Sequence, residues 1–103
     1  MAYKVLVTDE ADSDIDEVIG YIVNSLKNPI AAKNLLSEIE SSYDILSESP
    51  EAFACCEDSY LRELGYRKIP VKNYIIFYRV DHAEKTVYIM RVIYGRRDYA
   101  NLI

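Results

Sequence analysis

The chain has 103 residues, half of them apolar and 28% charged, which is the composition of one compact domain spanning residues 1–103. Three glycines and three prolines exclude a collagen-like or low-complexity chain. No apolar run approaches the roughly 18 residues of a membrane-spanning helix. Because the first residues also lack the apolar core of a secretion signal, the expected location is the cytoplasm.

The formal net charge of −5 is unevenly divided along the chain. Residues 1–51 carry eleven acids and three bases, whereas residues 52–103 carry six acids and nine bases. The second half therefore carries either an ordinary solvated sheet face or a cationic surface for phosphate or an acidic partner, and charge alone does not decide between them.

Side chains that bind metals or react as nucleophiles are scarce. Cys55 and Cys56 are adjacent, without the spacing of a zinc or redox motif, so we expect two dispensable reduced thiols. The single histidine, His82, is expected in a solvated turn. Many of the acids fall at the start of the first predicted helix, where the helix dipole favours them. We therefore expect no metal and no cofactor.

A strand and two helices are predicted in the first half. Lys4–Thr8 is short, β-branched and apolar, as strands are. A helix follows over 9–26, with one apolar stripe formed by Ala11, Ile15, Val18, Ile19, Ile22 and Leu26. Asn28 is a good N-cap and Pro29 suits the first helical position, so a second helix begins there and ends before Pro50. Its stripe contains Ala32, Leu35, Leu36, Ile39, Tyr43 and Leu46.

The second half changes to a period of two. After a loop over 48–63 with about one helical turn, three β-rich segments follow: Tyr66–Val71, Tyr74–Asp81 and Thr86–Tyr94. Short connections between them predict an antiparallel meander. The fold class is therefore α+β: a two-layer β-α-α-β-β-β arrangement in which an antiparallel helical hairpin packs on a mainly antiparallel sheet.

Strict alternation predicts the faces of the last two strands. In the first of them, Ile75, Phe77 and Arg79 oppose Tyr74, Ile76, Tyr78 and Val80. In the second, Val87, Ile89, Arg91 and Ile93 oppose Tyr88, Met90, Val92 and Tyr94. One face packs on the helices, and the other remains partly open unless a partner covers it.

Three motifs in order give the chain a family resemblance. They are R-x-I-P at Arg67–Pro70, N-Y-I-I-F-Y-R-V at Asn73–Val80 and R-V-I-Y-G-R-R-D at Arg91–Asp98. With the element order, they resemble the RelE/ParE superfamily of toxins from type II toxin–antitoxin modules. The resemblance implies a toxin that inhibits growth, a role in plasmid stabilisation, and neutralisation by a cognate antitoxin. It also implies contact with operator DNA only through the antitoxin, and none with a membrane.

The resemblance leaves open whether the chain is an enzyme. RelE-like toxins cleave mRNA in the ribosome without a metal, whereas ParE-like toxins bind DNA gyrase. For a nuclease, the matching residues are Arg67, Lys68 and Arg97. A RelE arginine that follows a strand tyrosine is replaced here by Ile75, and Tyr99 lies too early to match the late tyrosine. Gyrase-type inhibition is therefore favoured. The alternatives are a ribosome-dependent mRNA endoribonuclease and a degenerate, non-toxic antitoxin-binding module.

The candidate target-binding residues serve either mechanism. They are Arg67, Arg91, Arg96, Arg97 and Tyr99. Arginine forks bind phosphates or carboxylates in a bidentate way, so these side chains suit a nucleic acid or an acidic protein surface. As exposed residues, the arginines are expected to contribute little to stability. The remaining strand tyrosines are expected to pack in the sheet.

Overall fold

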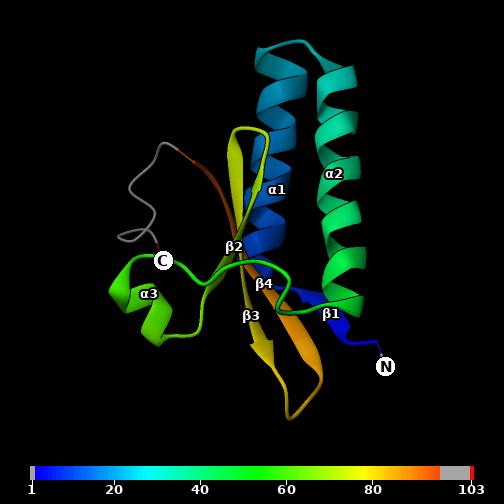
Figure 1. Cartoon of the computed structure of the whole chain (residues 1–103). Coiled ribbons are helices and arrows are strands. Elements are labelled where there is room, and N and C mark those ends of the chain that lie inside the picture. The colour runs from blue at the N-terminus through cyan, green and yellow to red at the C-terminus, as the bar shows by residue number, and fades with distance from the viewer. Residues whose placement is uncertain (1, 96–102) are drawn as a thin grey trace.

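The computed structural model describes residues 2–95 and 103, and it confirms the α+β class (Figure 1). Its elements in chain order are β1 (Lys4–Val7), α1 (Asp9–Gly20), the π-helical turn η1 (Tyr21–Ser25), α2 (Pro29–Glu48), α3 (Ser59–Glu63), β2 (Arg67–Val71), β3 (Tyr74–Asp81) and β4 (Thr86–Tyr94). None of the helices described is both long enough and apolar enough to cross a membrane.

The four strands form one sheet in the order β1-β4-β3-β2. Strands β2, β3 and β4 are antiparallel neighbours, as their short connections predict. Strand β1 pairs in parallel with β4, and the helical hairpin, α3, β2 and β3 together supply the long connection that parallel neighbours require. Strand β1 covers only the first part of β4, from Thr86 to Ile89. The two edges of the sheet are therefore β1 and β2.

Local capping fixes where both long helices begin. The Thr8 hydroxyl accepts from the Ala11 amide at 3.2 Å and donates to the Ile89 carbonyl at 2.8 Å, so it also ties α1 to β4. Asn28 caps α2 in the same way, with the Ala31 amide as donor at 3.1 Å. Both starts agree with the sequence prediction.

The apolar stripe predicts that the first helix continues in α form to Leu26, but the structure contradicts this. It changes to the π turn η1 after Gly20, and the Leu26 amide donates to the Tyr21 carbonyl at 3.1 Å, five residues back. The extra residue in the turn rotates the end of the stripe. Ile22 stays buried, whereas Leu26 is 56% exposed. In α2, Leu36 is also exposed rather than part of the stripe.

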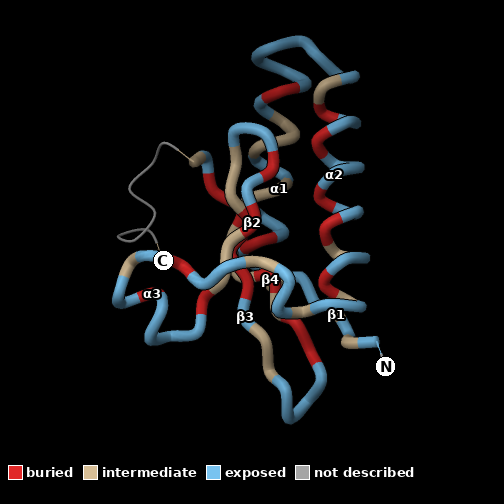
Figure 2. The backbone as a smooth tube through the Cα atoms, viewed as in Figure 1, coloured by how far each residue is buried: buried red, intermediate tan, exposed pale blue. Residues whose placement is uncertain are grey.

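The main core lies between the helical hairpin and the inner face of the sheet (Figure 2). Its strand residues include Ile76 and Tyr78 of β3, which are fully buried, as the predicted alternation requires. The helices contribute fully or almost fully buried side chains: Ala11, Ala32, Leu35, Ile39 and Leu46.

A β-bulge in β4 breaks the predicted alternation. Phe77 pairs with Arg91 but the next residue, Tyr78, pairs with Ile89, which leaves Met90 without a partner on β3. Beyond the bulge the faces of β4 are exchanged. Val92, predicted opposite Ile89, therefore joins it in the main core, and the predicted face of Arg91 and Ile93 is wrong.

The outer face of the sheet is partly covered by the chain itself. Helix α3 and the preceding loop place Cys56 and Leu61 against Phe77 and Ile93, and Ile103 packs against the same cluster. We call this the outer cluster. Full burial of Cys56 argues against its being dispensable, whereas Cys55 is exposed; both thiols are free.

Candidate functional site

The two cations predicted on β2 lie on opposite faces of the sheet. Arg67 pairs with Tyr78, a residue of the inner face, and Lys68 pairs with Phe77, a residue of the outer cluster. Since side chains alternate along a strand, Arg67 and Lys68 point in opposite directions. The structure therefore does not bring these two candidate nuclease residues together.

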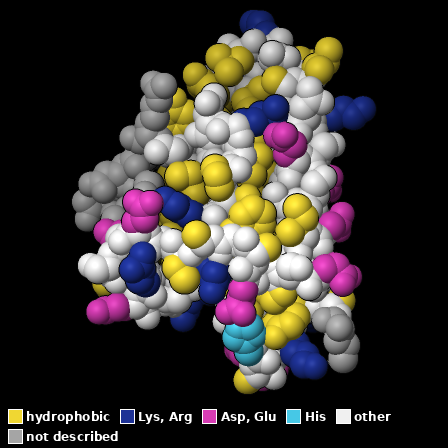
Figure 3. Space-filling view, viewed as in Figure 1, with side chains coloured by type: hydrophobic (Ala, Val, Ile, Leu, Met, Phe, Trp, Pro, Cys, Tyr) yellow, Lys and Arg dark blue, Asp and Glu magenta, His cyan; other side chains and the backbone are white. Residues whose placement is uncertain are grey.

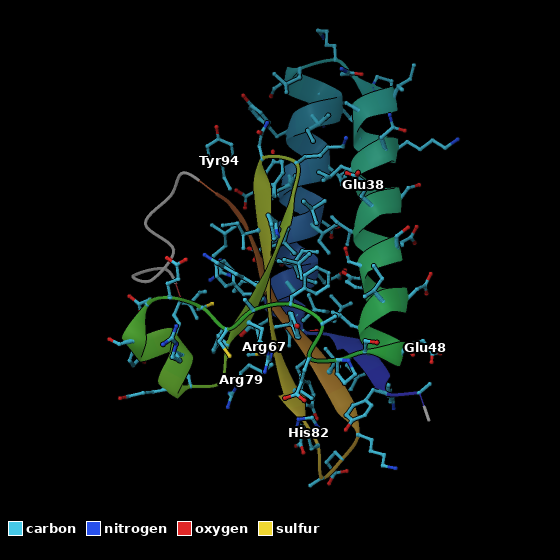
Figure 4. All side chains as sticks on the ribbon, in the orientation of Figure 1. Glu38, Glu48, Arg67, Arg79, His82 and Tyr94 are labelled. Carbon is cyan, nitrogen blue, oxygen red and sulfur yellow. The ribbon has the colours of Figure 1, made fainter. Side chains whose placement is uncertain are left out.

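The Arg67 side chain is held by the chain itself. Its guanidinium donates to the Phe53 carbonyl at 2.6 Å and to the Glu51 carboxylate at 3.3 Å. Glu51 also lies 3.4 Å from His82, whose other ring nitrogen is 2.7 Å from the Tyr3 hydroxyl. Arg67 and His82 are both labelled in Figure 4. This network fastens the loop after α2 to the β3–β4 turn, and it gives Arg67 a structural role.

Arg91 is not the exposed residue that the sequence predicts. Its Nε and a terminal nitrogen donate to the Asp14 carboxylate at 2.7 and 3.1 Å, and the Val92 amide donates to the same carboxylate at 3.0 Å. The side chains of Arg91 and Asp14 are only 27% and 15% exposed. The hydrogen bond that Arg91 donates to Asp14 raises the pKa of Arg91 above its usual value, although burial opposes this. The pair clamps α1 to β4.

Arg79 is a candidate that the sequence analysis did not include among the target-binding residues. It is exposed on the outer face of β3, and among the described residues its partner is an aromatic ring: its guanidinium lies 5.7 Å from the ring centre of Tyr66. Beside it is a shallow hollow of about 470 Å³, whose lining includes Thr8, Tyr88 and Met90. In Figure 4, Arg79 extends away from the helical hairpin. Alternation places it on this face, but only the structure shows that no described carboxylate binds it.

The remaining candidates, Arg96, Arg97 and Tyr99, lie outside the described residues. The structure fixes both ends of the segment that contains them. The Gly95 amide donates to the Asn73 carbonyl at 2.8 Å, and a Cβ at Gly95 would meet that carbonyl at 3.3 Å, so a glycine suits this close approach. At the other end, Ile103 contacts the outer cluster.

A second concave site, which the sequence analysis did not predict, lies between the end of the helical hairpin and the inner face of β3 and β4. It encloses about 870 Å³ and its lining includes Asp14, Glu17, Tyr21, Leu26, Tyr74 and Tyr94. We call it the tyrosine cleft. The rings of Tyr74 and Tyr94 meet edge to face at 5.7 Å, and burial raises the pKa of Tyr74, with Tyr21 and Tyr94 adding to the effect. Figure 3 shows the face of the molecule seen in Figure 1, on which patches of hydrophobic side chains lie among basic and acidic ones.

Neither site has the composition of a metal centre. No group of three His, Cys, Asp or Glu side chains in the described part of the chain is arranged to hold an ion. Both sites combine aromatic rings with charge, and such surfaces bind charged groups of proteins or nucleic acids.

Comparison with solved structures gives three similar folds. A chain of the chromosomal ParDE toxin–antitoxin system from P. aeruginosa matches with a TM-score of 0.71 at 20% identity, covering 90% of this chain and 96% of that one. A chain of the RelBE2 toxin–antitoxin complex from Mycobacterium tuberculosis matches with a TM-score of 0.62 at 21% identity, covering 91% and 99%. A mutant of the E. coli toxin RelE in the free state matches with a TM-score of 0.70 at 14% identity, covering 99% and 93%.

The family assignment comes from the sequence itself. No curated protein matches the chain. The model of the family described as the ParE toxin of the type II toxin–antitoxin system parDE, however, matches residues 5–99, which is nearly the whole chain. The chain therefore belongs to the ParE toxin family of type II toxin–antitoxin systems, within the RelE/ParE superfamily that its motifs indicate.

Proposed function

We propose that this toxin inhibits growth by binding DNA gyrase rather than by cleaving mRNA. The observation that carries the proposal is the ParE family match over residues 5–99. The proposal is supported by Ile75, which occupies the position of an arginine in RelE-like toxins. Ile75 packs against the outer cluster. The cytoplasm, where gyrase acts, is the proposed location.

The contacts of Arg67 also favour binding over catalysis. A metal-free ribonuclease needs an acid, a base and cations around one phosphate. Here Arg67 is held on the helix side by Glu51 and the Phe53 carbonyl, while Lys68 lies on the outer side. A catalytic group built from both would have to span the sheet.

The proposed target-binding residues are Arg79, which lies on the open part of the outer face, and Arg96, Arg97 and Tyr99, whose positions the structure does not describe. A guanidinium in cation–π contact with an aromatic ring, as Arg79 is with Tyr66, remains able to bind carboxylates of an acidic protein surface. Arg67 and Arg91 make contacts within the chain, and their part in target binding stays a prediction.

Induced expression with and without the antitoxin, together with a gyrase supercoiling assay on the purified toxin, tests the proposal. We expect filamentation, an SOS response and inhibited supercoiling. Arg79→Glu and the double reversal of Arg96 and Arg97 should each abolish inhibition while the circular dichroism spectrum stays unchanged. Lys33→Glu, an exposed charge reversal on α2, is the control and should inhibit as the wild type does.

Each alternative gives a different result. Rapid translation arrest with cuts in ribosome-bound mRNA would show that the toxin is an endoribonuclease and not a gyrase inhibitor. Antitoxin binding without any growth inhibition would indicate a degenerate module. If the charge reversals leave supercoiling inhibition intact, gyrase remains the target but the proposed surface is wrong.

A further inference from the structure

We propose that the antitoxin lays an extended segment along the free edge of β4 and inserts one lysine or arginine side chain from it into the tyrosine cleft. This inference rests on the antitoxin partner of the proposed function and not on the choice of gyrase as target. Three independent features of the structure support it: the aromatic walls of the cleft, a carboxylate in it that no described cation pairs with, and the strand edge beside it that no described strand pairs with.

The walls of the cleft are unusually exposed for apolar side chains. Tyr21 and Leu26 are 54% and 56% exposed, and Tyr94 is 37% exposed. The π turn η1 is what directs Leu26 outward instead of into the hairpin core. Tyrosine rings bind both the aliphatic stem and the cationic head of a long basic side chain. The walls therefore suit such a side chain better than a short polar one.

The charge of the cleft selects a cation. Asp14 and Glu17 are three residues apart on α1 and so lie on the same side of the helix. Arg91 neutralises Asp14, whereas Glu17 forms no ion pair with any residue of 2–95 or 103. One negative charge therefore remains at the rim of a half-enclosed aromatic site. A guanidinium or ammonium group that enters between the rings would pair with it.

The strand edge selects an extended backbone. Strand β1 ends at Val7, opposite Ile89, so no described strand pairs with the rest of β4 on this side. The Val92 amide points to this edge, where the Asp14 carboxylate binds it. By alternation, the amide and carbonyl of Tyr94 point the same way, while the Gly95 amide points back to Asn73. The Tyr94 amide and carbonyl therefore offer main-chain hydrogen bonds to an added strand, whereas the Val92 amide is already bound by Asp14.

The strand edge and the cleft together indicate which kind of partner binds. Tyr94 is part of both, so a strand that pairs with β4 at Tyr94 directs alternate side chains toward the cleft. A helix would leave the edge groups unpaired, and a small cation would use only the carboxylate. An antitoxin is the partner present in the similar ParDE and RelBE2 systems. A second copy of this chain, presenting Lys4 of its own strand β1, is the competing occupant that the experiment must distinguish from the antitoxin.

The test is a binding titration of the full-length toxin with the purified product of the antitoxin gene beside its own. Glu17→Gln is expected to weaken binding about threefold and Glu17→Lys about tenfold, since Glu17 is exposed at the rim of the cleft and its charge is first lost and then reversed. Asp16→Asn is the matched control, because Asp16 is exposed on the same helix and does not line the cleft. It should bind as the wild type does. Exchanging one antitoxin lysine or arginine for glutamate should restore binding of Glu17→Lys, which identifies the inserted residue.

Hydrogen exchange supplies the second readout. The Tyr94 amide is expected to exchange much more slowly in the complex if a strand is added. Unchanged affinity of both Glu17 variants would refute the insertion of a basic side chain into the cleft. A Tyr94 amide that stays unprotected in the complex would refute the addition of a strand to β4. A toxin that dimerises alone, and no longer does so as Glu17→Lys, would assign the cleft to a second copy. Because the titration uses two purified proteins, its result does not depend on whether gyrase is the target.

Discussion

The clamp between Asp14 and Arg91 gives the sharpest prediction about stability. Replacing Asp14 with alanine removes a carboxylate that accepts from the Arg91 side chain twice and from the Val92 amide once. Because both side chains are less than a third exposed, water replaces these bonds incompletely. We expect a loss of about 2–3 kcal/mol of unfolding free energy, at the low end for a buried charged pair because some exposure remains.

Urea unfolding followed by circular dichroism measures this loss. For a domain of this size, 2 kcal/mol corresponds to a fall in melting temperature of roughly 8–16 °C. Asp14→Asn keeps one acceptor oxygen and should lose about half as much free energy. Asp16→Ala, exposed on the same helix, should change stability by no more than about 0.5 kcal/mol. In a double-mutant cycle, Asp14→Ala and Arg91→Ala should couple by about 1–2 kcal/mol. A loss below 0.5 kcal/mol for Asp14→Ala would refute the clamp and restore Arg91 as an exposed, available arginine.

Three further predictions concern single side chains. Cys56→Ser places a hydroxyl in the outer cluster and should cost about 1–3 kcal/mol in urea unfolding, whereas Cys55→Ser should stay within about 0.5 kcal/mol. Burial raises the pKa of both Tyr43 and Tyr78 to about 12, above the value of about 10 in unfolded chains. The unfolded state therefore loses these protons first, and the urea midpoint should fall as pH rises from 10 to 12; a constant midpoint would contradict the burial of these hydroxyls. Gly65→Ala should cost about 1 kcal/mol, because φ is 83° there and nothing lies within 4 Å of the added Cβ, so backbone strain is the whole effect.

The elements that depend on local patterns were predicted well from the sequence. The bounds of β3 and β4 and the start of α2 agree with the predictions, because alternation, turn residues and the Asn28 cap act over a few neighbouring residues. The first helix was predicted as one element, although it ends in a π turn. A single inserted residue leaves the apolar spacing almost unchanged, so the pattern carries no clear signal of it.

The environments of the arginines could not be predicted, because they depend on contacts distant in the sequence. Arg91 binds the carboxylate of a residue 77 positions away in the sequence. The bulge at Met90 determines on which face of the sheet each later side chain of β4 lies. Arg67 is engaged by a carbonyl and a carboxylate of the loop after α2. Charge patterning thus located the basic half of the chain, but only the fold separates cations that hold the structure together from Arg79, which remains open to a partner.

The positions of the two proposed surfaces lead to a last prediction. The tyrosine cleft opens on the inner face of the sheet and Arg79 lies on the outer face, but both border β4. Side chains of a strand added along β4 alternate between the two faces, so one set enters the cleft and the other extends over the outer face. Antitoxin and gyrase should therefore exclude each other. A preformed toxin–antitoxin complex should retain no gyrase on an affinity column, and Glu17→Lys, by releasing the antitoxin, should restore gyrase retention in the same mixture. A stable complex of all three proteins would show that the antitoxin does not reach the outer face from this edge.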